Sequence, residues 1–209
     1  MRFVTAAALA AFVFANAGPA RAEDPVVRGE KLYGLCTQCH GPEAAGDPLS
    51  LAPAIAGLPA WYVEAQLKYF KGGARGTHPD DKGGLRMYPM SLALKSDSDI
   101  SAAAAYVASL PRTRPPVTVQ GDAAKGANSY KTCAACHGPD GNGNQALNAP
   151  SLVGSSDWYL VESLKKFKAG VRGGNTGNQN AILMRGMALS LADDQAINDV
   201  VAHIMTLRD

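Results

Sequence analysis

Apolar and aromatic residues recur at helical spacing along this chain, and polar capping residues stand before the segments in which they do so. Residues 59–70 and 156–167 show the clearest periodicity. Residues that favour helix N-termini precede further helix-forming runs: Asp24 with Pro25, Ser96, Asp122 and Asp193. The stretches between are rich in Gly, Pro and Asn and lack the alternation typical of strands, so the pattern predicts an all-α fold.

Two long loops interrupt this pattern, at about residues 72–85 and 169–182. Loops of that length are uncommon in a small domain unless something anchors them. Each is followed by a Met-x-x-Met sequence, formed by Met87 and Met90 in the first case and by Met184 and Met187 in the second. A bond between a methionine sulfur and a metal ion would be such an anchor.

The chain contains an internal duplication. At a constant offset of 97, residues 29–110 and 126–207 share 28 identities in 82 aligned positions without a gap. The proline-rich residues 111–120 lie between the copies and favour an extended, stiff connector. The sequence therefore predicts an N-terminal domain at residues 23–110, a linker at 111–120 and a C-terminal domain at 121–209.

The first 22 residues have the features of an export signal. Arg2 precedes an almost entirely apolar stretch at residues 3–17, and Ala20-Arg21-Ala22 ends in a cleavage pattern. The apolar stretch is too short for a comfortable membrane span. These features predict export to the periplasm with cleavage after Ala22, and an uncleaved anchor is the alternative.

Charge argues against two classes of partner. The full chain has 20 basic and 18 acidic residues, and removal of Arg2 and Arg21 with the signal leaves 18 of each. Each predicted domain is also balanced, and no long basic run is present. We therefore expect no nucleic-acid footprint and no basic lipid-binding patch.

The residues that carry chemistry are concentrated in one motif that occurs twice. The two copies of Cys-x-x-Cys-His consist of Cys36, Cys39 and His40, and of Cys133, Cys136 and His137. Together they use all 4 cysteines of the chain. This motif attaches c-type haem: both thiols bind one porphyrin, and the histidine binds its iron. The sequence predicts two covalently bound haem c groups with His40 and His137 as proximal ligands.

Two other interpretations of the cysteines remain. A Cys-x-x-Cys pair occurs in thioredoxin-type redox sites, but those require a βαβ context that this chain does not predict. The two pairs could instead form one zinc site with four cysteine ligands. That arrangement gives no purpose to the histidines or to the offset of 97 residues between the pairs, so haem is the favoured interpretation.

The sixth ligand of each iron must come from the opposite side of the haem. His78 and His203 are not equivalent in the repeat, because they align with Asn175 and Tyr106. Methionine is the candidate ligand that occurs twice at matched positions, and its thioether suits low-spin iron. Packing of these methionines in a core is the alternative.

At these motifs the chain resembles the class I diheme cytochromes c, specifically the cytochrome c4 family, over essentially the whole length after the signal. The shared features are Cys-x-x-Cys-His-Gly near each domain start, Ala-Pro-x-(Ile/Leu), a Trp-Tyr helix, and Met-x-x-Met ahead of the last helix. The resemblance implies two tandem class I cytochrome c domains, each a small helical domain wrapped around one haem.

The resemblance also implies roles for particular residues. In that family the first methionine of each pair binds iron, which favours Met87 and Met184 and leaves Met90 and Met187 as runners-up. Histidine Nδ1–H groups would donate to the carbonyls of Pro53 and Pro150, and such a bond fixes the ring and raises its basicity.

Two six-coordinate haems leave no open site for a small-molecule substrate, so we expect a non-enzymatic electron carrier. The resemblance implies redox proteins as partners: a quinol-oxidising complex or dehydrogenase as donor and a terminal oxidase as acceptor, with peripheral association to membrane complexes. The alternative is a permanently bound electron-accepting subunit of a periplasmic dehydrogenase, of flavocytochrome type. A diheme peroxidase ranks third, because it needs a haem that opens.

Overall fold

The computed structural model describes residues 23–174 and 177–207, and within these ranges the molecule is built from helices. Two isolated β-bridges, Asp47–Ala52 and Asn144–Ala149, occur there, and neither extends into a strand. The all-α prediction is confirmed. The predicted signal, residues 1–22, lies outside the described residues.

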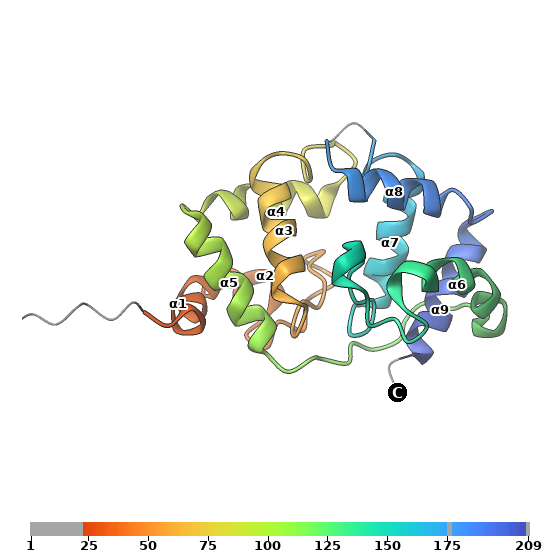
Figure 1. Cartoon of the computed structure of the whole chain (residues 1–209), viewed down its shortest axis with the longest axis horizontal. Coiled ribbons are helices and arrows are strands. Elements are labelled where there is room, and N and C mark those ends of the chain that lie inside the picture. Colours follow the sequence, from red (N-terminus) through yellow and green to blue (C-terminus); the bar gives the residue numbers. More distant parts are fainter. Residues whose placement is uncertain (1–22, 175–176, 208–209) are drawn as a thin grey trace, which may run out of the picture.

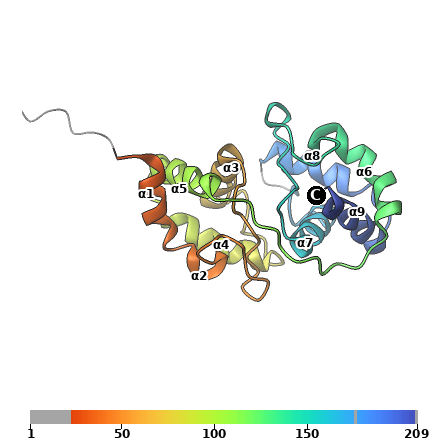
Figure 2. The ribbon, with the colours of Figure 1, turned by 90° about the horizontal axis from the view of Figure 1, so that it is seen from below.

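The helices form two bodies that lie side by side (Figures 1 and 2). The first comprises α1 (Pro25–Tyr33), α2 (Thr37–His40), α3 (Ala60–Lys71), α4 (Lys82–Leu92) and α5 (Asp97–Ser109). The second comprises α6 (Ala123–His137), the 3₁₀ helix η1 (Gln145–Leu147), α7 (Asp157–Lys168), α8 (Gln179–Ala188) and α9 (Asp194–Thr206). The two tandem domains follow the sequence repeat, so that α3 corresponds to α7, α4 to α8 and α5 to α9.

The predicted capping residues explain where four of the helices begin. Asp24 accepts a hydrogen bond from the Val26 amide at 2.8 Å. Ser96 and Asp99 form a reciprocal capping box at the start of α5. Asp122 and Asp193 cap α6 and α9 in the same way as Asp24. Each cap satisfies backbone N–H groups that have no partner inside the helix.

The first and last helices of each domain cross in close contact at a glycine. A Cβ atom on Gly29 of α1 would lie 2.1 Å from the Ala102 carbonyl oxygen of α5. On Gly126 of α6 it would lie 1.9 Å from the Asp199 carbonyl oxygen of α9. No side chain fits at either crossing, so glycine sets the distance between these helices.

The domains differ in how their cores are filled. In the second domain α6, α7 and α9 enclose one continuous cluster that includes Ile197, Val200, Val201 and Ile204. The first domain has alanine where Val200 and Val201 stand, and its buried apolar residues form two smaller clusters. A domain of this size buries little surface by itself. We therefore expect the first domain, whose clusters are smaller, to gain more from the apolar surface of a bound group.

The loops ahead of the methionine pairs end about four residues earlier than the sequence predicted. Helices α4 and α8 begin at Lys82 and Gln179, so all four methionines lie on helices. Asp81 caps α4 by accepting from the Gly84 amide at 3.0 Å, and Asn178 caps α8 in the same position. The glycines near the start of α4 and Pro89 inside it concealed this helix in the sequence, because both residue types disfavour helix interiors.

The segment between the domains is held at both ends. Arg112 donates to the Gly57 carbonyl oxygen at 3.4 Å and to the Asn142 side chain at 3.3 Å. Further along, the buried Asp157 carboxylate accepts hydrogen bonds from the Thr118 amide, the Thr118 hydroxyl and the Val119 amide. The linker is therefore fixed to the protein at both ends.

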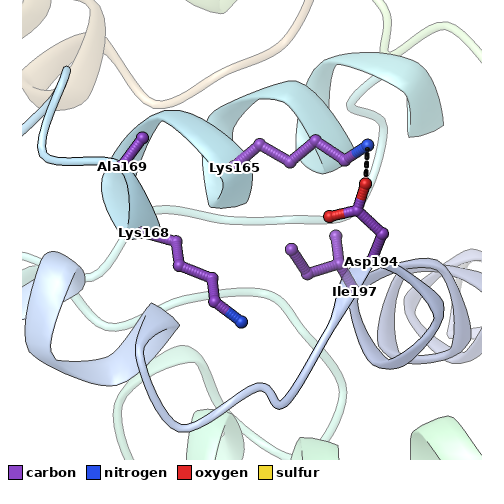
Figure 3. A pocket seen from close by; sticks show the side chains of 5 residues that line it. All are labelled: Lys165, Lys168, Ala169, Asp194 and Ile197. Atoms are coloured by element: carbon purple, nitrogen blue, oxygen red, sulfur yellow. Dashed lines mark hydrogen bonds and ion pairs between the residues drawn. The ribbon is translucent and has the colours of Figure 1, made fainter.

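A lysine at the end of α7 secures the turn before α9 (Figure 3). Lys168 donates to the carbonyl oxygens of Leu191 and Ala192, and Lys71 makes the equivalent bonds in the first domain. The adjacent surface hollow of about 310 Å³ also contains the Lys165–Asp194 ion pair, at 2.7 Å. Its charged groups are thus engaged in holding the fold.

We expect Gly126→Ala to destabilise the protein by about 1–3 kcal/mol, the usual range for an added group in a packed crossing. The added methyl would collide with the Asp199 carbonyl. Chemical denaturation measures the loss. Lys125→Ala, an exposed change on the same helix, is the control and should remain within about 0.5 kcal/mol of the parent. Equal stabilities for the two variants would contradict the close crossing.

Candidate haem sites and the interface between them

Each cysteine motif lies on helical backbone. Cys36 stands at the N-cap of α2, which carries Cys39 and His40, and the second motif ends α6. Helical residues three apart share one face, so both thiols of a motif can meet the same planar group. All four cysteines are free. They are therefore available for thioether bonds.

The motif histidines are buried and held by one hydrogen bond each. His40 Nδ1 lies 2.9 Å from the Pro53 carbonyl oxygen, and His137 Nδ1 lies 2.8 Å from that of Pro150. Because a carbonyl oxygen only accepts, Nδ1 carries the hydrogen and Nε2 keeps its lone pair. Burial lowers the pKa of both imidazoles and outweighs the opposite effect of this bond. Neutral imidazole with a free Nε2 is the form that binds a metal.

A tyrosine fixes the backbone just after each motif. The Tyr33 hydroxyl donates to the Gly41 carbonyl oxygen, and the Tyr130 hydroxyl donates to that of Gly138, both at 2.8 Å. Each ring also packs on the last helix of its domain. Tyr130 contacts His203 there, with ring centroids 5.1 Å apart, so His203 packs against an aromatic ring.

The methionine pairs lie on α4 and α8. Met87 and Met184 are partly buried, whereas Met90 and Met187 are 40% and 41% exposed. Members of a pair are three residues apart and share a helix face. The choice of Met87 and Met184 as iron ligands stays a prediction.

Both methionine helices leave apolar side chains uncovered at matched positions. Leu85 and Ile182 are each 41% exposed, and Leu92 and Leu189 are 41% and 56% exposed. Exposed apolar residues that recur in both copies indicate surface that another group covers. A porphyrin has the apolar faces to do so, and the residues present fit it.

The two domains meet at a pair of equivalent arginines. Arg75 donates to the Tyr159 hydroxyl of the other domain at 2.8 Å, and its guanidinium stacks on Phe70. Arg172 occupies the matched position and stacks on Phe167. Both arginines line one small cavity between the domains.

An ion pair also joins the two domains. The Lys166 ammonium of α7 lies 3.0 Å from the Asp81 carboxylate, which is 3% exposed and caps α4. The repeat places Tyr69 and Asn178 at the equivalent positions, so the pair has no counterpart. The Ser156 hydroxyl also accepts from the Ala54 amide across the domains, at 3.1 Å.

The interface carries more positive than negative charge. Burial alone would raise the pKa of Tyr159, but the charges of Arg75 and Arg172 outweigh it and lower that pKa. Burial and the like charge of Arg75 lower the pKa of Arg172. Arg75 Nε is buried without a hydrogen-bond partner. The guanidinium groups of Arg75 and Arg172 can therefore bind additional carboxylates. Each haem has two propionates that could supply them.

The pooled zinc site is not formed. Across residues 23–174 and 177–207, no three His, Cys, Asp or Glu side chains converge into a metal-binding group. All four cysteines fall within these ranges, one pair in each domain.

Comparison with known proteins agrees with this geometry. The profile of the cytochrome c family, described as "Cytochrome c", matches residues 26–111 and 123–208. The thiosulfate dehydrogenase electron acceptor of Stutzerimonas stutzeri is 31% identical over 198 residues, which cover 84% of this chain and 86% of that protein. Cytochrome c4 of Thiocapsa roseopersicina is 29% identical, over 82% of this chain and 87% of that protein. The crystal structure of reduced cytochrome c4 from Pseudomonas stutzeri superposes with a TM-score of 0.68 at 28% identity, over 86% of this chain and 97% of that one.

Two matched domains that each present a held histidine beside a pair of free thiols define a c-type cytochrome, and the chain belongs to the cytochrome c family. Within that family it is a class I diheme cytochrome of the cytochrome c4 family. It binds two haem c groups covalently and carries electrons to and from redox proteins.

The interface residues were missed by reasoning from the sequence. Arg75-Gly76 and Arg172-Gly173 are identical at the repeat offset of 97. This identity could have indicated a functional site, because a charged residue that occurs at equivalent positions of two repeated domains is a candidate for a shared role. Only the structure brings the two arginines to the same cavity.

We expect Met87→Ala to abolish the methionine–iron charge-transfer band of one haem, and Met184→Ala that of the other, because alanine offers no ligand. Absorption spectra of the oxidised protein measure this. The matched controls Met90→Ala and Met187→Ala should keep both bands. Because their side chains are 40% and 41% exposed, they should lose less packing energy than the about 2–5 kcal/mol that a buried methionine loses. If a control loses a band instead, the second methionine of that pair, Met90 or Met187, is the iron ligand.

Proposed function

We propose that this chain is a freely diffusing periplasmic carrier, which takes single electrons from a quinol-oxidising complex or dehydrogenase and passes them to a terminal oxidase. The observation that carries it is the matched pair of sites. Each domain offers a buried, hydrogen-bonded histidine and a methionine at equivalent positions. If these residues held the iron from both sides in each domain, no position would be left for a substrate, which supports a carrier without catalytic activity of its own.

The protein's residues divide the work of holding each group. We assign covalent attachment to Cys36 and Cys39 in the first domain and to Cys133 and Cys136 in the second. We assign axial coordination to His40 with Met87, and to His137 with Met184. A bound haem supplies one-electron exchange between ferric and ferrous iron, and histidine–methionine ligation raises its potential.

Residues that contact the ligands hold them in place and limit their movement when the iron changes oxidation state. The Pro53 and Pro150 carbonyls orient the histidine rings, and such bonds also raise ligand basicity. Arg75 and Arg172 would neutralise propionates between the domains, where positive charge is in surplus. Ligands that hold the same positions in both oxidation states favour fast transfer.

The signal-like sequence of the first 22 residues supports a periplasmic location. The first 22 residues read as a cleaved signal, and covalent haem attachment outside the cytoplasm agrees with it. Within the described residues, no helix is both long and apolar enough to cross a bilayer.

One relative favours a second candidate function. The protein from Stutzerimonas stutzeri is named a thiosulfate dehydrogenase electron acceptor and matches 84% of this chain. Under this second hypothesis, the chain is the electron-accepting subunit of a dehydrogenase and receives electrons within a permanent complex.

We expect the protein purified from the native periplasm to begin at Glu23 and to have the polypeptide mass plus two haems. Mass spectrometry measures this, and the haem should resist acidified acetone because thioethers survive that treatment. Cys136→Ala should lose haem from the C-terminal domain only. Release of haem into acetone, or stoichiometric zinc, would reject the assignment.

We further expect substoichiometric amounts of the protein to sustain electron flow from a purified quinol-oxidising complex to a terminal oxidase, because a free carrier turns over. Oxygen consumption measures the flow. Cys36→Ala/Cys133→Ala, which cannot attach either haem normally, is the control. Co-purification in fixed stoichiometry with a dehydrogenase, without stimulation of oxygen consumption, would favour the subunit reading instead.

A further inference from the structure

The first turn of α4, the helix that carries Met87, has little tendency of its own to be helical. Residues 82–84 form this turn and include two glycines, which are poorly suited to a helix interior. Pro89 lacks the amide hydrogen that the helix ladder needs at its position. The equivalent turn of α8, residues 179–181, contains no glycine. Helix α4 therefore depends more than α8 on support from outside its own sequence.

Asp81 supplies this support at the N-cap of α4. Its side-chain Oδ1 accepts a hydrogen bond from the Gly84 amide at 3.0 Å, and its carbonyl oxygen accepts from the Leu85 amide at 2.7 Å. A Cβ atom on Gly84 would lie 2.1 Å from Oδ2 of this carboxylate, so only glycine leaves room for it there. A negative charge at this place is also favourable to the helix dipole.

The counter-charge for this buried carboxylate comes from the other domain. The Lys166 ammonium of α7 lies 3.0 Å from the same Oδ1 atom of Asp81 that caps α4. The Lys166 side chain is 20% exposed, so water screens the pair little. Burial alone would raise the pKa of Asp81, but the hydrogen bond and charge of Lys166, with Arg75 and the Gly84 amide, lower that pKa. The carboxylate is therefore ionised.

This support runs from the second domain to the first and not in reverse. The repeat places the uncharged residues Tyr69 and Asn178 where Lys166 and Asp81 stand. Asn178 caps α8 by accepting from the Ala181 amide at 3.1 Å. A neutral amide carries no charge that burial would penalise, so the cap of α8 needs no lysine.

Contacts inside the first domain hold other parts of α4. Arg86 donates to the Ser50 carbonyl oxygen at 2.8 Å, in an exposed bond beyond the first turn. Gly76 packs closely on the Gly84 carbonyl, but this contact between backbone atoms offers no charge to hold Asp81. The position of the capping carboxylate thus depends on Lys166.

We infer that Lys166 is a positioning residue for the N-terminal haem, although it belongs to the C-terminal domain. It holds the Asp81 carboxylate over the first turn of α4 and thereby keeps the methionine of that helix on the iron. Without the ammonium group, the carboxylate would turn toward water or take up a proton, because a buried charge without a partner is costly. The inference rests on the proposed coordination by α4 and applies whether Met87 or Met90 is the ligand.

The test is the rate at which imidazole replaces the methionine ligands in the intact, oxidised diheme protein. Loss of the methionine–iron band follows the replacement, and haem methyl NMR signals, assigned by their NOEs, identify the domain that reacts. Lys166→Met removes the charge and keeps an unbranched side chain. It should accelerate replacement at the N-terminal haem at least about tenfold, the change that about 1.4 kcal/mol of lost support produces. The C-terminal haem should react at the parent rate, although the substitution lies in its own domain.

Three further variants complete the experiment. Lys165→Met removes a neighbouring lysine that pairs with Asp194 of its own domain, and it should change neither rate. Lys166→Arg keeps the charge and should stay close to the parent. Asp81→Asn gives α4 the neutral cap that α8 has, so adding Lys166→Met to it should cause no further acceleration. That double variant leaves no buried charge unpaired, and it keeps the test decisive if Lys166→Met alone does not fold.

Equal acceleration at both haems in Lys166→Met, or none at the N-terminal haem, would overturn the inference. A pair that only holds the domains together would lower the melting temperature and affect both haems alike. Either result leaves the proposed function intact, because the parent protein would still show two methionine–iron bands and reversible one-electron reduction. Failure of the proposed function has a different signature, the absence of those bands from the parent itself.

Discussion

The hydrogen bond between each motif histidine and a proline carbonyl 13 residues later is the contact on which each domain is organised. It closes the loop that follows the motif, and a second bond, from the Gly46 or Gly143 amide back to the histidine carbonyl, closes it again. The ring is thereby held from both its side chain and its backbone.

Local sequence signals were enough to predict most of the helices. Asp24, Ser96, Asp122 and Asp193 each cap the helix that was expected after them, because a cap depends only on the next few residues. The repeat then extended each assignment from one domain to the other. The thiols and histidines of the motifs could likewise be identified from spacing alone.

The remaining features depend on contacts between distant residues. Helix α4 begins with Lys82-Gly83-Gly84 and contains Pro89, so its own sequence argues against a helix. It forms because Asp81 caps it and because α3 packs against it. The arginine cavity between the domains was unpredictable for the same reason, since Arg75 and Arg172 are 97 positions apart and no local pattern brings them together.

The anchored linker gives the molecule a kinetic property that two separate cytochromes lack. Bonds from Thr118 and Val119 to Asp157, together with those of Arg112, fix the connector to both domains. Exchange of an electron between the haems is then a unimolecular event, whose rate does not fall on dilution. The protein can accept a second electron from its donor before the first electron has been passed to an acceptor.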